Sequence, residues 1–209
     1  MKFSIIIPCY NYGRSLAMTV NSVTSQNYNN YEIIIINDGS FDNTHEISKT
    51  LCENHSEKDI RYIKIQNQGL AFVRNLGVKE SKGVYLIFLD ADDTMASSAL
   101  ETYSAAALKS SMPGMIVGGY NSINKKCKYH PVATIPIDKS KAFMFYLKKK
   151  ISLSNGAVAI HRDVFETIRY NPLLRQSEDI PVFSWILLTQ KCISVNKPTA
   201  NIFRHPDSL

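Results

Sequence analysis

Three aspartates stand within four residues, at Asp90, Asp92 and Asp93, directly after the apolar run Val84–Leu89. Carboxylates crowded in this way repel one another unless a cation or hydrogen-bond donors compensate their charge. Mg²⁺ or Mn²⁺, held by one or two carboxylates together with a diphosphate, would provide that compensation. An aspartate that only caps the next helix is the structural alternative. The position of the turn after a buried strand, beside other polar turns, favours a metal site.

The chain carries neither of the glycine-rich loops that commonly hold phosphates. There is no G-x-G-x-x-G after the first apolar segment and no G-x-x-x-x-G-K-[ST] anywhere in the sequence. A dinucleotide-dependent dehydrogenase or a P-loop ATPase would therefore lack its usual phosphate-binding loop. A phosphate must instead be neutralised by a metal and by Arg74, which lies early in a helix that starts near Gly69. Taken alone, Arg74 would be interpreted as one partner of a surface ion pair.

Four short apolar segments, with helical patterns between them, must position these groups. The segments are 4–7, 32–36, 60–65 and 84–89. Their length and their content of Ile, Val, Tyr and Phe suit strands that are buried on both faces. Strand–helix alternation predicts an α/β fold, a mostly parallel, Rossmann-like sheet with right-handed crossovers and helices on both faces. Ligands of such sheets bind beyond the carboxyl ends of the strands, where this chain has polar turns at 8–11, 37–40, 67–69 and 90–93.

The pattern loosens after about residue 112. Strands are predicted at 115–118, 132–135, 157–160, 192–195 and 200–203, and helices at 139–150 and 180–190. Strands without regular helical connections indicate a mixed sheet. No repeat, low-complexity stretch or flexible linker interrupts the sequence, so residues 1–209 are expected to form a single domain. Its two lobes would be 1–110 and a smaller mixed lobe, 111–209.

Composition excludes a disordered chain and a chain that crosses a membrane. The sequence is 44% apolar and 20% charged, an ordinary globular balance. Its longest apolar runs have six residues, whereas a membrane-spanning helix needs about 20. The amino-terminal segment is too short for a signal peptide. Four widely spaced cysteines suit reduced thiols, and together these features predict a cytoplasmic protein.

The positive charge is concentrated in one segment. Residues 125–150 contain eight lysines and one acidic residue, and the rest of the chain is nearly neutral. This distribution argues against nucleic acid as a partner. Lysines also flank the apolar run Ala142–Leu147, which suits a helix lying on an anionic membrane surface. A buried core helix with solvated ends is the alternative interpretation.

Five motifs in order resemble the signature of glycosyltransferase family 2. They are Ser4-Ile5-Ile6-Ile7-Pro8-Cys9-Tyr10-Asn11, Ile36-Asn37-Asp38-Gly39-Ser40, Asn67-Gln68-Gly69-Leu70-Ala71 with Arg74-Asn75, Leu89-Asp90-Ala91-Asp92-Asp93, and Ser177-Glu178-Asp179. The closing segment 203–208, with His205, is similar to the late Arg/His segment of that family. The resemblance implies the GT-A fold, a nucleotide-sugar donor, a divalent metal (Mn²⁺ or Mg²⁺) and a glycan or lipid-linked saccharide acceptor. It also implies a role in surface polysaccharide biosynthesis, with peripheral contact at the inner face of the cell membrane.

The resemblance also implies a role for each matching residue. Residues 1–110 would bind the donor and 111–209 the acceptor. The nucleotide, UDP in this family's usual pattern, would be contacted by Pro8, Tyr10, Asn11, Asp38, Arg74 and Asp90. Asp92 would ligate the metal, with His205 as a further ligand, and Asp179 would be the general base. A carboxylate can take the proton of an acceptor hydroxyl, and a metal can stabilise the leaving diphosphate. Single displacement would then invert the configuration at C1.

Two other classes of protein remain open at this point. A sugar-phosphate nucleotidyltransferase also combines a Rossmann-like sheet with acidic metal ligands. It would typically need a loop rich in Gly, Lys and Arg after the first strand, where this chain has Cys9-Tyr10-Asn11-Tyr12-Gly13-Arg14. A non-catalytic carbohydrate-binding protein would give no reason for Asp179 and the acidic turn to occur together.

Overall fold

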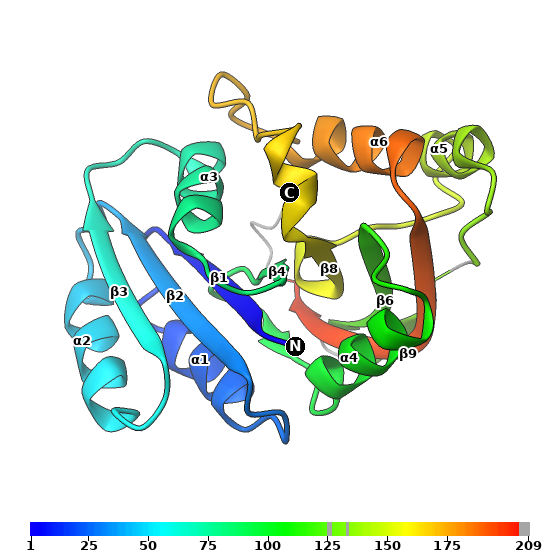
Figure 1. Ribbon diagram of the computed structural model, residues 1–209. Helices are drawn as coiled ribbons and strands as arrows, with labels where there is room; N and C mark the ends of the chain where they lie inside the picture. The colour runs from blue at the N-terminus through cyan, green and yellow to red at the C-terminus, as the bar shows by residue number, and fades with distance from the viewer. Residues whose placement is uncertain (125–126, 133, 205–209) are drawn as a thin grey trace.

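One nine-stranded sheet crosses the whole molecule (Figure 1). The computed structural model describes residues 1–124, 127–132 and 134–204. The strands are β1 (Phe3–Cys9), β2 (Tyr31–Asp38), β3 (Ile60–Ile65), β4 (Tyr85–Phe88), β5 (Thr94–Met95), β6 (Met115–Ile123), β7 (Cys127–His130), β8 (Val158–His161) and β9 (Cys192–Phe203). Their order is β3-β2-β1-β4-β8-β6-β9-β5, and β7 pairs with β6.

The two halves of the sheet differ in strand direction. Strands β3, β2, β1 and β4 are all parallel. In the second half β8 is antiparallel to both β4 and β6, while β6 and β9 run parallel. The prediction of an α/β fold with a mostly parallel first half and a mixed second half is therefore confirmed. Because the first four strands share one direction, their carboxyl ends meet at one edge of the sheet.

Helices cover both faces of the sheet (Figure 1). They are α1 (Leu16–Thr24), α2 (Thr44–Asn54), α3 (Leu70–Glu80), α4 (Ala99–Lys109), α5 (Lys139–Leu147) and α6 (Asp179–Thr189), with the 3₁₀ turns η1 (Asn155–Ala157) and η2 (Arg162–Glu166). Helices α1, α2 and α4 pack on one face and α3, α5 and α6 on the other. Successive strand residues point to opposite faces, so Ile5 and Ile7 join the first core and Ile6 joins the second.

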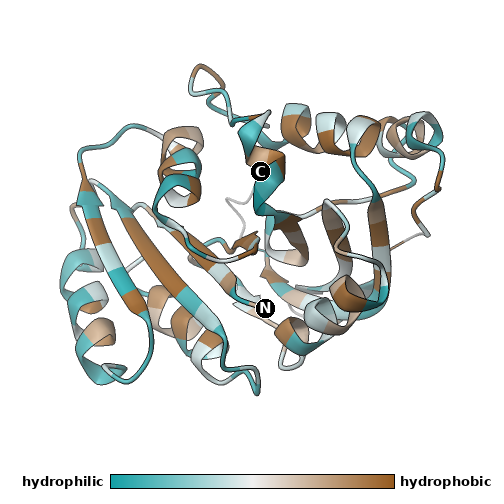
Figure 2. Cartoon of the chain, in the orientation of Figure 1, coloured by the Kyte–Doolittle hydropathy of each residue, from teal (hydrophilic) through white to brown (hydrophobic). Residues whose placement is uncertain are grey.

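This double cover explains the mostly apolar character of the central strands. Every residue of β1, β2 and β4 is buried, as expected when both faces of a strand meet helices. Strand β3 departs from that expectation, because its residues are only half-buried apart from the exposed Lys64. It lies at the edge of the sheet, where one side has no neighbouring strand. Figure 2 shows apolar residues concentrated along the central strands.

Three details of the second half correct the predicted elements. The strand predicted at 132–135 is wrong for the described residues there, since Val132, Thr134 and Ile135 belong to no strand. The hairpin partner of β6 is instead the polar segment β7, whose residues are largely exposed. The two strands predicted at the carboxyl end form one strand, β9, which bends through register shifts opposite Gly118 and Gly119. Residue 133 lies outside the described residues.

The lysine-flanked run forms helix α5, which ends at Leu147 rather than at residue 150. Ala142 is buried against α6, while Phe143, Phe145 and Tyr146 pack at the edge of that core. Met144 and Leu147 remain 43% and 53% exposed. Helix α5 is thus neither fully buried nor apolar all round. No described helix has the length and apolar composition to span a membrane.

Candidate active site

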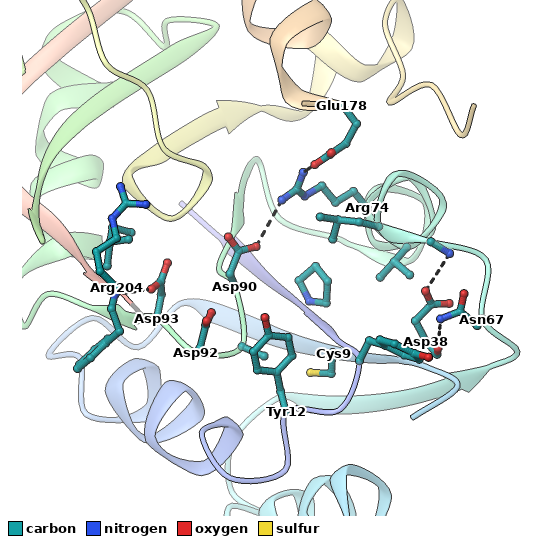
Figure 3. Close-up of a pocket in the computed structure, with 18 residues that line it drawn as sticks. Cys9, Tyr12, Asp38, Asn67, Arg74, Asp90, Asp92, Asp93, Glu178 and Arg204 are labelled. Carbon is teal, nitrogen blue, oxygen red and sulfur yellow. Dashed lines mark hydrogen bonds and ion pairs between the residues drawn. The ribbon is translucent and has the colours of Figure 1, made fainter. Parts of the chain in front are cut away.

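A cavity of about 620 Å³ opens at the carboxyl ends of the parallel strands (Figure 3). Its walls come from the turns after β1, β2, β3 and β4, from α3, and from the carboxyl end of β9. The lining residues are Pro8, Cys9, Tyr10, Tyr12, Asp38, Asn67, Gly69, Leu70, Val73, Arg74, Asp90, Ala91, Asp92, Asp93, Glu178, Ile202, Phe203 and Arg204. The structure therefore brings together five of the predicted nucleotide-contacting residues, all but Asn11, and the predicted metal ligand Asp92.

The acidic turn after β4 is held by its backbone. Thr19 Oγ1 of α1 lies 2.9 Å from the carbonyl oxygen of Ala91 and 2.8 Å from that of Asp93. The Asp93 carboxylate accepts a hydrogen bond from Phe203 N at 2.9 Å. Burial, with the charges of Asp90 and Asp92, raises the pKa of Asp93 to about 8, against the lowering effect of that hydrogen bond. The turn is thus fixed in place by contacts with α1 and β9.

Asp38 at the end of β2 organises the next turn. Its two carboxylate oxygens accept hydrogen bonds from Gln68 N at 2.7 Å and Gly69 N at 2.9 Å. Asn67 donates to the backbone oxygen of Asp38 at 3.0 Å. Gly69 has a φ of +89°, a conformation that favours glycine. Asp38 therefore both faces the cavity and fixes the start of α3, which carries Arg74.

The turn after β1 divides its predicted residues between two places. Pro8 and Tyr10 line the cavity, and the ring of Tyr10 meets that of Phe41 edge-on at 5.4 Å. Asn11 lies outside the lining. Its backbone N–H donates to Ser40 Oγ at 2.9 Å, and its side-chain oxygen accepts from Phe41 N at 3.0 Å. Asn11 thus joins two turns to each other, a role that its place in a motif does not reveal.

Arg74 is buried and joins the two halves of the molecule. Its guanidinium pairs with Glu178 at the start of α6 and lies 3.4 Å from the Asp90 carboxylate. It also lies over the ring of Tyr170, 5.4 Å from the ring centre. Only 2% of the Arg74 side chain is exposed, so the surface ion pair considered from the sequence is wrong. Glu178 is a buried partner of Arg74, which agrees with a supporting role in the site.

Asp179, the predicted base, is the first residue of α6 and lies beside the cavity rather than in its lining. Its side chain contacts Asn155, whose amide nitrogen is 3.5 Å from Asp179 Oδ2. Burial raises the pKa of Asp179 above its usual value; Glu178 adds to that rise, and Arg74 opposes it. A carboxylate with a raised pKa is a stronger base than an ordinary aspartate.

The carboxylates of the acidic turn are the described side chains that suit a divalent metal ion. No group of three or more His, Cys, Asp and Glu side chains in ranges 1–124, 127–132 and 134–204 has the geometry to hold an ion. The acidic turn nevertheless presents carboxylate oxygens, which hard divalent cations prefer. Such an ion commonly keeps one or two protein ligands beside phosphates and water, so the turn fits this mode of binding. The predicted ligand His205 lies outside the described residues.

Sequence reasoning missed three groups in the lining. Tyr12 lies opposite the acidic turn (Figure 3), and burial with the charges of Asp92, Asp90 and Asp93 raises its pKa to about 12. Asn67 fixes the turn after β3, and Arg204 faces Asp93 from the end of β9 (Figure 3). Tyr12 adjoins a motif, whereas Asn67 and Arg204 lie within segments that the sequence analysis singled out without giving either residue a role. Only the folded structure shows that the side chains of Tyr12, Asn67 and Arg204 line the cavity.

Comparison with known proteins identifies relatives of the amino-terminal part. The sequence model described as Glycosyl transferase family 2 matches residues 4–169. The chain is 42% identical over 100 residues to an uncharacterized glycosyltransferase of Rickettsia bellii, covering 48% of this chain and 14% of that protein. It is 40% identical over 108 residues to the uncharacterized Escherichia coli glycosyltransferase YibD, covering 52% and 31%. The chain thus spans less than a third of the length of either relative.

Solved structures show the same fold over nearly the whole chain. The crystal structure of S. aureus TarS in complex with UDP has a TM-score of 0.83 at 19% identity, covering 99% of this chain and 61% of that one. The mannosyltransferase PcManGT from Pyrobaculum calidifontis, in complex with GDP-Man and Mn²⁺, has a TM-score of 0.70 at 16% identity, covering 95% and 56%. These neighbours are GT-A glycosyltransferases, and at such identities the likeness shows the fold, as the sequence motifs predicted.

Proposed function

The chain belongs to glycosyl transferase family 2, and we propose that it is an inverting transferase that moves a sugar from a UDP-sugar to an acceptor hydroxyl. The acceptor is a glycan or a lipid-linked saccharide, and the reaction serves the synthesis of a surface polysaccharide. Two solved neighbours, S. aureus TarS with UDP-GlcNAc and PcManGT with GDP-Man, are described as complexes with nucleotide-sugars. They support a nucleotide-sugar as the donor.

The observation that carries the proposal is the convergence of opposite charges on one cavity. Asp90 and Asp92 face it from the turn after β4, Arg74 enters from α3, and Glu178 from the start of α6. A nucleoside diphosphate needs cationic groups for its phosphates and polar groups for its base and ribose. Asp38 stands at the far end of the lining from Arg204 (Figure 3), and the nucleoside would lie there. Pro8 and Tyr10 also line the cavity.

Divalent metal binding is part of this proposal. Asp92 holds Mn²⁺ or Mg²⁺ together with the diphosphate, and His205 supplies a further ligand. The metal neutralises charge on the diphosphate when it is bound. PcManGT and GalNAc-T7 are both described as complexes with Mn²⁺. Arg74 is positioned by Glu178 and Asp90, so its charge is directed at the same region of the cavity.

Asp179 acts as the general base. Its carboxylate takes the proton of the acceptor hydroxyl as the hydroxyl oxygen forms a bond to C1 of the sugar. The bond from C1 to the β-phosphate oxygen breaks at the same time, and UDP leaves with the electron pair. Attack from the face opposite UDP inverts C1. The partly exposed position of Asp179 beside the donor cavity suits a base that meets an incoming acceptor.

We also place the enzyme in the cytoplasm, with α5 in peripheral contact with an anionic membrane surface. Lys141, Lys148, Lys149 and Lys150 are exposed on and after this helix. Lysines next to exposed apolar side chains favour the surface of an anionic bilayer. That contact would bring the site to a lipid-linked acceptor.

A donor screen tests the proposed function. The protein is incubated with single nucleotide-sugars, with Mn²⁺ or with a chelator, and release of nucleoside diphosphate is measured. We expect slow Mn²⁺-dependent release of UDP from one or a few UDP-sugars, because water can replace the acceptor. Release of inorganic diphosphate from a nucleoside triphosphate and a sugar phosphate, without turnover of any nucleotide-sugar, would contradict the proposal and identify a nucleotidyltransferase.

A further inference from the structure

Asn155 is a buried polar residue that none of the roles above explains. It is 7% exposed and begins the 3₁₀ turn η1, which packs against β4 and β9 near the middle of the sheet. Its Nδ2 lies 3.5 Å from Asp179 Oδ2. Its Oδ1 is buried and has no hydrogen-bond partner among the described residues. The contact with Asp179 is therefore the one hydrogen bond found for this side-chain amide within the described part of the chain.

The orientation of the amide follows from the charge that it faces. The opposite orientation would place the amide oxygen against the Asp179 carboxylate, where the two oxygens would repel each other. A separation of 3.5 Å is at the outer limit of a hydrogen bond. Hydrogen bonds at catalytic groups are often this long before substrate binds. Asn155 is thus oriented as a donor to Asp179.

Charged and titratable groups surround Asp179 from every element packed near it. Arg74 of α3 is the cation, while Asp90 after β4 and the adjacent Glu178 are acidic. Tyr146 of α5 and Tyr170 before α6 also lie within electrostatic range. The Arg74 guanidinium is already paired with Glu178 and Asp90. Among the described residues, Asn155 is the neutral side chain that donates a hydrogen bond to the Asp179 carboxylate.

We propose that Asn155 is a positioning residue, which donates a hydrogen bond to Asp179 and fixes the carboxylate in the ionised form and orientation needed to take a proton. This inference rests on the proposed role of Asp179 as the base. A purely structural asparagine would be expected to satisfy both ends of its buried amide, whereas Asn155 leaves Oδ1 unpaired. The packing of η1 against β4 and β9 positions the donor.

The test measures the Asp179 carboxyl directly. Protein labelled with ¹³C at the aspartate carboxyl carbons is titrated by NMR, and the Asp179 signal is assigned by its absence from Asp179→Asn. In Asn155→Leu, of similar size but without a donor, we expect the pKa of Asp179 to rise by about one unit. In Asn155→Asp it rises further, because a second carboxyl faces the first. Asn121→Leu is the matched control, since Asn121 bonds Asn201 on β9.

Turnover separates this inference from the proposed function. Turnover is measured with the UDP-sugar selected by the donor screen. Asn155→Leu is expected to lower kcat, to shift the acid limb of the pH–rate profile to higher pH, and to leave the KM for donor unchanged. An unchanged Asp179 pKa in both Asn155 variants overturns the positioning role, even if the fold loses stability. Full turnover in Asp179→Asn instead overturns the base, and with it the positioning role. If Asp179→Asn has no turnover but Asn155→Leu keeps a normal acid limb in its pH–rate profile, only the role of Asn155 is refuted.

Discussion

Among single residues, Asp92 offers the most direct test of metal-dependent donor binding. Asp92→Asn keeps the shape of the side chain and removes its charge. We expect this variant to bind UDP equally with and without Mn²⁺, whereas the unaltered protein binds UDP more tightly with Mn²⁺. Titration calorimetry measures both affinities. Asp163→Asn, at a side chain that is 72% exposed and outside the cavity lining, is the control.

An unaffected Asp92→Asn variant would remove Asp92 from the metal site. Equal UDP affinity in the unaltered protein with and without Mn²⁺ would remove the metal from donor binding. The first result tests whether Asp92 is a metal ligand, and the second tests whether donor binding depends on a metal. Because His205 lies outside the described residues, the same titration on His205→Ala asks whether the late segment contributes a ligand.

Asp179 carries a second prediction at this scale. Asp179→Asn should leave UDP binding nearly intact while turnover falls about 100-fold or more, the usual scale for the loss of a positioned base. Its position beside the cavity but outside the lining is the reason to expect little change in binding. Steady-state kinetics at saturating donor, with calorimetry for UDP, measure the two effects. Weakened UDP binding with normal turnover would assign Asp179 to the donor pocket instead.

Between elements, the buried pair of Arg74 and Glu178 links α3 to the start of α6. Their side chains are 2% and 8% exposed, so removing one partner leaves a buried charge without its counter-ion. Arg74→Met should therefore lower the free energy of unfolding by about 3–5 kcal/mol. The double variant Arg74→Met with Glu178→Met should lose less than Arg74→Met alone, because the buried Glu178 charge is removed together with its partner, whereas Asp90 loses Arg74 in both variants. Urea unfolding of the four proteins measures the coupling, and additive losses would contradict it.

The burial of Asp93 in the acidic turn predicts a pH dependence of stability. The pKa of Asp93 rises from its ordinary 3.8 to about 8 in the fold, so between these values the folded state holds a proton that the unfolded state lacks. The stabilising contribution is complete below about pH 4 and is lost as pH rises through about 8. In metal-free buffer, Tm should fall over this range. Asp93→Asn should weaken the fall, and parallel curves for both proteins would refute the assignment.

For the molecule as a whole, the lysines around α5 predict adsorption to anionic membranes. Replacing Lys148, Lys149 and Lys150 by Gln removes three charges worth about 1 kcal/mol each near such a surface. In this variant, binding to vesicles that contain phosphatidylserine should fall about 100-fold. In the unaltered protein, the same binding should weaken as salt is added. Sedimentation of vesicles measures binding. The control replaces the exposed Lys49, Lys82 and Lys109 by Gln, which changes net charge equally. Equal losses in both variants, or no binding at low salt, would refute a role for α5.

The sequence alone determined the first half of the fold. Strands β1, β2 and β4 are nearly continuous apolar runs because helices cover both of their faces. Burial on both faces can therefore be recognised from the composition of these segments. The polar turns that follow the strands are equally readable. Parallel strands bring their carboxyl ends to one edge, so residues as far apart as Pro8, Asp38 and Asp92 could be placed at one site from their order in the sequence.

The sequence predicts the strands of the second half less accurately. The β7 hairpin is polar and exposed, so it has no apolar pattern to detect. Val132 and Ile135 are apolar because they pack against the core around α5 and α6, and packing of irregular segments gives no periodicity. Strand β9 appeared as two strands because its middle residues are exposed where the register with β6 shifts. Burial, not intrinsic strand preference, controls these patterns.

Only the tertiary structure decided what the polar side chains contact. The Arg74–Glu178 pair joins residues 104 positions apart, and Asn155 reaches Asp179 from a different element. Asn11 belongs to the same motif as Tyr10, yet one joins two turns and the other faces the cavity. Residue type and spacing specify which element a side chain belongs to. Its direction, burial and partner depend on how distant elements pack against one another, which no local pattern records.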